Sequence, residues 1–98
     1  MLLSQTKLVA VLSLLEKEEW GDLQDFILGK TSAESDLFGV FLFFKAQKET
    51  LHLLSETEAV VDRFFSHLTT KVFQNHMSTL FAYSESWLAI REMLTKKY

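Results

Sequence analysis

The 98-residue sequence contains no proline and only three glycines. These two residues interrupt helices more often than any others, so long stretches of the chain meet no local obstacle to helix formation. Apolar residues also recur at intervals of three and four positions rather than at every second position, which is the spacing of one face of an α-helix. The sequence therefore predicts an all-α fold, a compact bundle of about five helices that ends in one long C-terminal helix.

Two apolar stripes near the N-terminus predict the first two helices. The first stripe is Leu8, Val11, Leu12 and Leu15, and the second is Trp20, Leu23, Ile27 and Leu28. Ser4 or Thr6 is expected to cap the first helix, because a hydroxyl oxygen there accepts a hydrogen bond from a free backbone N–H. Gly29 is typical of a helix end and is expected to close the second helix.

The segment 37–44 allows two interpretations, because eight consecutive residues without a polar side chain could form a buried strand or a buried helix. A strand needs partners for its backbone groups, and no other segment alternates between apolar and polar residues. We therefore predict a central helix over about residues 36–48, apolar almost all round. It should follow the polar linker 31–35, with Ser35 or Ser32 at its start.

Two further helices complete the predicted fold. Ser55 and Glu58 have the spacing of a capping box, in which each side chain binds the other residue's backbone N–H, so a fourth helix is expected to start at Ser55. It should end near residues 69–70, with Val60 or Val61, Phe64, Phe65 and Leu68 facing inward. Residues 71–98 contain no helix breaker and are predicted to form one helix. Its apolar face is Phe73, Met77, Leu80, Phe81, Trp87, Leu88 and Leu94, interrupted by Ser84 and Arg91.

Composition and motifs argue against several classes of function. A net charge of -3 gives no electrostatic reason to bind nucleic acid or a membrane surface, and no apolar run approaches the roughly 20 residues of a membrane-spanning helix. Cysteine is absent, the three histidines are scattered, and no glycine motif for phosphate binding occurs. We therefore predict no catalytic residue, no cofactor and no metal site. No signal peptide is recognisable, and the protein is expected to be non-enzymatic and cytoplasmic.

The chain is instead rich in apolar residues, which make up 48% of it. A last helix of 28 residues is about 42 Å long and should protrude from a domain of this size. Apolar surface that a small bundle leaves uncovered usually marks a binding face. We therefore expect a protein–protein interaction or assembly module that binds a protein partner or forms a homodimer. The candidate interaction residues are Trp87, Leu94, Phe43 and Phe44, although each could be ordinary core.

Two other functions compete with this interpretation. An acidic cluster at the start of the second helix, most simply a solvated helix face, could bind a basic partner. The protein would then be a small acidic inhibitor or adaptor, of the immunity-protein or death-fold kind, and its association should slow as salt is added. The cluster is Glu16, Glu18, Glu19, Asp22 and Asp25. The third and least favoured function is an enzyme with a small apolar pocket under the central helix.

Several short sequences also suggest a family. They are Leu-Leu-Glu-Lys-Glu-Glu-Trp at 14–20, Phe-Ile-Leu at 26–28, Leu-Phe at 37–38, Phe-Gln-Asn-His-Met-Ser-Thr-Leu at 73–80 and Glu-Ser-Trp-Leu at 85–88. In this pattern the chain resembles the N-terminal domain of long, helical-repeat-like hypothetical proteins of Bacteroidetes. The resemblance implies no activity. It implies a single all-α domain over residues 1–98, which in relatives is followed by further helices, so the chain could be the N-terminal part of a longer helical protein.

Overall fold

A computed structural model describes residues 2–96, with side chains described over residues 2–92. The elements follow in the order η1 (Leu3–Gln5), α1 (Lys7–Leu12), α2 (Lys17–Leu28), α3 (Asp36–Ala46), η2 (Leu51–Leu53), α4 (Thr57–Phe64) and α5 (Thr70–Lys96), where η marks a single 3-10 turn. Within residues 2–96, β structure is limited to one antiparallel bridge between Leu2 and Glu56. The predicted all-α fold is confirmed, including the helical assignment of residues 37–44 and the long last helix.

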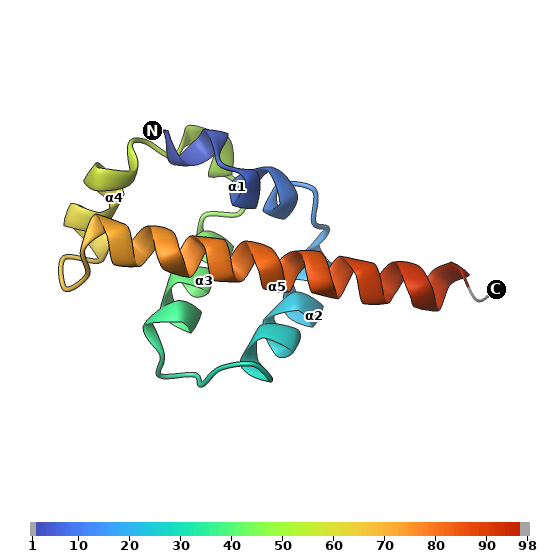
Figure 1. Cartoon of the computed structure of the whole chain (residues 1–98). Coiled ribbons are helices and arrows are strands. Elements are labelled where there is room, and N and C mark those ends of the chain that lie inside the picture. The colour runs from blue at the N-terminus through green and yellow to red at the C-terminus, as the bar shows by residue number, and fades with distance from the viewer. Residues whose placement is uncertain (1, 97–98) are drawn as a thin grey trace.

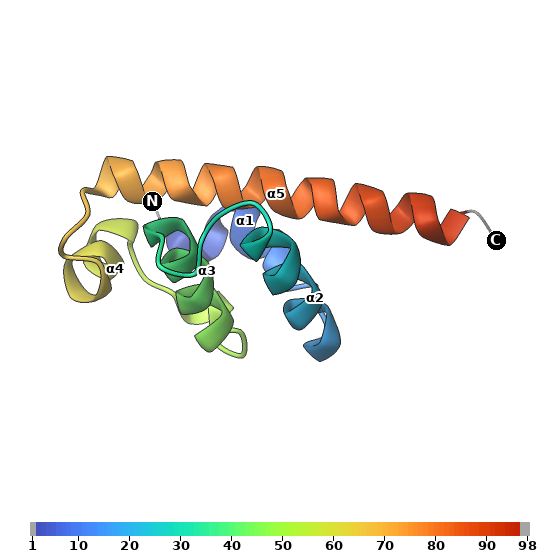
Figure 2. The ribbon, with the colours of Figure 1, turned by 90° about the horizontal axis from the view of Figure 1, so that it is seen from below.

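Helix α5 runs the length of the molecule, and the four other α-helices are arranged along it (Figure 1). Seen from below, α1 to α4 all lie on one side of α5, and the other side of α5 faces outward (Figure 2). Each of the four packs against α5. The long helix therefore organises the fold, and its inward face supplies one wall of the core.

The core is largely aromatic and lies where α3 meets α5 and α2. Phe41 and Phe44 of α3 and Phe73 of α5 are fully buried. Phe41 packs on Trp20 of α2 with 6.0 Å between ring centroids, and Phe44 packs on Phe73 at 6.5 Å. Tilted aromatic pairs at such distances attract each other beyond what the burial of their area provides. Helix α3 is therefore central and buried on most of its surface, as predicted.

Three helix boundaries agree with the sequence analysis. The Thr6 hydroxyl caps α1 by accepting a hydrogen bond from the backbone N–H of Val9 at 3.3 Å, and Ser35 caps α3 in the same way. Helix α2 ends at Gly29. The φ of Gly29 is -70°, in the right-handed helical region, so the helix ends there without the left-handed conformation that usually selects glycine.

The predicted boundaries of the fourth helix are wrong. Helix α4 begins after Glu56, and no capping box joins Ser55 to Glu58 within the described residues. The backbone gives the reason, because the Ser55 carbonyl oxygen accepts a hydrogen bond at 2.9 Å from the N–H of Leu3 in the N-terminal segment. The helix also stops at residue 64 instead of 69–70, since Phe65 leaves the helical conformation and is buried in the core.

Two side chains that were assigned to inward faces lie at the surface. Leu28 is the last residue of α2 and is largely exposed, whereas its neighbour Ile27 is fully buried. Phe64 is also exposed, and its ring packs against that of Phe43 with 5.0 Å between centroids. Both residues end their helices, where one step along the chain turns a side chain by about 100° and no further element follows to cover it.

The last turns of α5 extend past α2, so the predicted protrusion of this helix is confirmed (Figure 1). The molecule measures 46 Å along its longest axis, against 27 and 19 Å along the others. Among the described residues, no helix is at once long enough and apolar enough to cross a membrane.

Two glycines inside helices offer a test of the described packing. Nothing lies within 4 Å of the Cβ atom that alanine would add at Gly21 of α2 or Gly39 of α3. Alanine is favoured over glycine inside a helix by about 0.5 to 1 kcal/mol, so Gly21→Ala and Gly39→Ala should each raise the melting temperature by a few degrees. Circular dichroism during heating measures the change. A lower melting temperature for either variant would show that its site is more crowded than described.

Candidate interaction surface

Two of the four predicted interaction residues are part of the core. Trp87 has 6% of its surface exposed and Phe44 has none. Trp87 lies on the inward face of α5, three residues after the buried Ser84, and the guanidinium of Arg91 stands 4.7 Å from the centre of its ring. Neither Trp87 nor Phe44 is therefore an exposed anchor for a partner. The amphipathic stripe of α5 is covered by the chain's own helices over this stretch.

The other two predicted residues have different fates. The side chain of Leu94 lies outside the described residues. Phe43 is half-buried and borders a shallow surface pocket of about 270 Å³ between α3, η2 and α4. Exposed Leu53 and Phe64 line the same pocket, and the Arg63 guanidinium stands 5.3 Å from the centre of the Phe64 ring. Phe43 thus belongs to a partly exposed apolar surface, which the sequence analysis anticipated only through this one residue.

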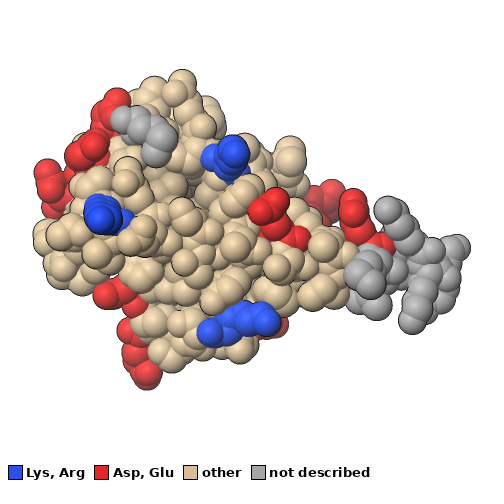
Figure 3. Space-filling model, in the orientation of Figure 1, with Lys and Arg blue, Asp and Glu red and all other residues tan. Residues whose placement is uncertain are grey.

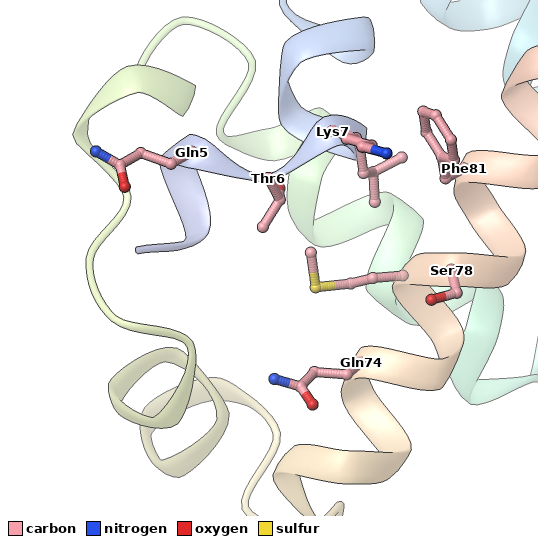
Figure 4. Close-up of a pocket in the computed structure, with 8 residues that line it drawn as sticks. Gln5, Thr6, Lys7, Gln74, Ser78 and Phe81 are labelled. Atoms are coloured by element: carbon pink, nitrogen blue, oxygen red, sulfur yellow. The ribbon is translucent and has the colours of Figure 1, made fainter. Parts of the chain in front are cut away.

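A larger groove lies between the N-terminal segment and α5, and we call it the α1–α5 groove (Figure 4). Its volume is about 550 Å³. The apolar side chains in it are Leu8, Met77 and Phe81, and the polar ones are Gln5, Thr6, Lys7, Gln74 and Ser78. Pockets that bind ligands typically combine an apolar lining with a few polar groups at fixed positions. The α1–α5 groove has this composition.

The N-terminal wall of the groove is held in place by hydrogen bonds. The Thr6 hydroxyl donates to the carbonyl oxygen of Leu3 at 2.8 Å, while also capping α1. Leu3 itself is fully buried, and its N–H is bonded to Ser55 as described above. The wall is therefore anchored at both the backbone and the side-chain level, so the groove is present before a ligand binds.

The groove carries little charge. Lys7 is its one ionisable residue, and no carboxylate or imidazole lines it. The molecular face over α5 and α1 likewise shows only scattered charged side chains, most of which gather toward the edges (Figure 3). A general acid–base pair needs two titratable groups within reach of one substrate. The groove is therefore suited to binding and offers no set of groups for acid–base chemistry.

The acidic cluster at the start of α2 is partly engaged in the fold. The Glu19 carboxylate accepts a hydrogen bond from the backbone N–H of Glu16 at 2.8 Å and pairs with Arg91 of α5. These two interactions, in that order, hold the pKa of the Glu19 carboxyl below its ordinary value. Glu19 thus joins the N-terminus of α2 to the protruding helix, and Glu16, Glu18, Asp22 and Asp25 remain exposed beside it.

The histidines do not converge. His67 lies 3.2 Å from a carboxylate oxygen of Asp36, in an exposed contact between the segment after α4 and the start of α3. Within the described part of the chain, no group of three or more His, Asp or Glu side chains is placed to hold a metal ion.

Sequence reasoning missed the α1–α5 groove. Its two walls come from residues 5–8 and 74–81, which are brought together only by the packing of α1 on α5. No protein-family model matches the chain, and no curated protein and no solved structure is significantly similar to it. The resemblance to the helical-repeat-like proteins of Bacteroidetes therefore stays a prediction.

Proposed function

We propose that the protein is a non-enzymatic interaction module that binds a protein segment in the α1–α5 groove. The observation that carries this proposal is the make-up of the groove, with Leu8, Met77 and Phe81 exposed to a ligand among uncharged polar groups. An apolar side chain of a partner would displace water from these residues. The amides of Gln5 and Gln74 can donate and accept hydrogen bonds, as a peptide backbone requires.

Peptide selection tests the proposal without knowledge of the natural partner. A displayed random peptide library is enriched on the wild-type protein, and the recovered peptides are then measured on two variants. Ser78→Arg places a long charged side chain in the groove, whereas Ser86→Arg makes the same change at an exposed position of α5 outside the groove. Circular dichroism first verifies that both variants keep the helical fold.

We expect peptides rich in apolar residues whose affinity falls at least tenfold on Ser78→Arg and stays unchanged on Ser86→Arg, since binding in a groove depends on its free volume. Failure to enrich any peptide, or equal binding to both variants, would contradict the proposal. Strong weakening by added salt would instead favour the acidic-inhibitor function, because exposed charge pairs are screened and apolar contacts are not. The exposed carboxylates of α2 would then be the binding surface.

A further inference from the structure

The most exposed large hydrophobic side chain on the described surface is Leu14, at 81%. It follows the last residue of α1, and the chain keeps a helical path there. The N–H of Ser13 donates to the carbonyl oxygen of Val9 at 2.8 Å, and the N–H of Leu14 donates to that of Val11 at 3.1 Å. Leu14 is thus presented on an ordered turn, which lowers the entropic cost of burying it in an interface.

Leu14 and the α1–α5 groove lie on one face of α1. Lys7, which lines the groove, and the exposed Ala10 and Leu14 are spaced by three and four residues, so they form one helical stripe. Seven residues separate Lys7 from Leu14, which is about 10 Å along a helix axis. The small side chain of Ala10 lies between them and allows a second helix to approach closely.

The charges at the two ends of this stripe are complementary. No ion pair or hydrogen bond involves the Lys7 ammonium within the described part of the chain, and the same holds for the Glu18 carboxylate, which follows Leu14 at the start of α2. A basic residue therefore borders the groove, and an acidic residue lies beyond the protruding leucine. An arrangement of this kind complements itself when two copies meet in opposite directions.

We propose that the chain forms a symmetric homodimer in which Leu14 of each copy enters the α1–α5 groove of the other. The twofold axis passes near Ala10, so that the two α1 helices cross in opposite directions and Lys7 faces Glu18 of the second copy. Because each copy gives a leucine and receives one, the contact is the same from both sides and closes at two subunits. The inference rests on the proposed function, since it makes the groove the site and a second copy the occupant.

Sedimentation equilibrium over a range of protein concentrations tests this inference. We expect the wild type to dimerise and Leu14→Glu to raise the dimer dissociation constant at least tenfold, because a carboxylate would enter an apolar groove. Leu53→Glu is the matched control, since it changes an equally simple exposed leucine, 69% exposed, outside this face and should leave the constant unchanged. Circular dichroism of each variant verifies that the fold is kept.

A charge exchange tests the arrangement of the two copies. Lys7→Glu should weaken the dimer several-fold, and adding Glu18→Lys to the same chain should restore it, because the opposite charges then face each other again. Unchanged affinity in Lys7→Glu, or no recovery in the double variant, would overturn this arrangement. A wild type that stays monomeric up to about 1 mM would overturn the homodimer itself. The proposed function would survive that result if selected peptides still bind the wild type and fail to bind Ser78→Arg.

Discussion

Replacing Trp20 by alanine should lower the free energy of unfolding by about 3 to 5 kcal/mol. The indole is 3% exposed, and its ring packs against that of Phe41 in the centre of the core. Alanine would remove the apolar contacts of the indole and leave a cavity between α2 and α3, which this small core has few means to fill. Denaturant titration followed by circular dichroism measures the loss.

Leu28→Ala in the same helix is the control, because Leu28 is an apolar residue at the surface. It should cost less than about 1 kcal/mol. Similar losses for the two variants would place Trp20 nearer the surface of α2 than the structure has it. A loss above 3 kcal/mol for Trp20 alone would support the packing of α2 on α3.

Much of the fold could be predicted because it depends on local rules. Helix caps act within three or four residues, so Thr6 and Ser35 were recognisable from their own neighbours. The helical form of residues 37–44 followed from the lack of any partner for a strand. The start of α4 could not be predicted in this way, because Ser55 is engaged by Leu3 from the opposite end of the chain. A distant backbone hydrogen bond there overrides a local capping pattern.

The candidate site was harder to predict than the fold. Periodicity marks which face of a helix is apolar, but it does not say whether another element covers that face. Trp87 and Phe44 were for this reason taken as candidates for binding, although α2, α3 and α5 enclose them. The α1–α5 groove has the opposite character, since its residues look unremarkable in sequence and gain their meaning only from the contact of α1 with α5.

The structure also changes the weight of the competing functions. An acidic inhibitor needs carboxylates that are free to meet a basic partner, and Glu19 is instead paired with Arg91 and the backbone of Glu16. Part of the acidic cluster therefore serves to hold α5 against α2. The remaining carboxylates border Leu14, where they complement Lys7 of a second copy in the proposed homodimer.

Trp87→Ala should unfold the protein more readily rather than dissociate it, with a loss of about 3 to 5 kcal/mol in the free energy of unfolding. The side chain is 6% exposed and fills the junction of α5 with the other helices, under the guanidinium of Arg91. Ile90→Ala, three residues further along α5 at a largely exposed position, is the control and should cost less than about 1 kcal/mol. Denaturant titrations at two protein concentrations separate folding from association, because only a dimer's stability depends on concentration. A Trp87→Ala variant that keeps its unfolding free energy but loses its concentration dependence would return Trp87 to the interface and remove it from the core.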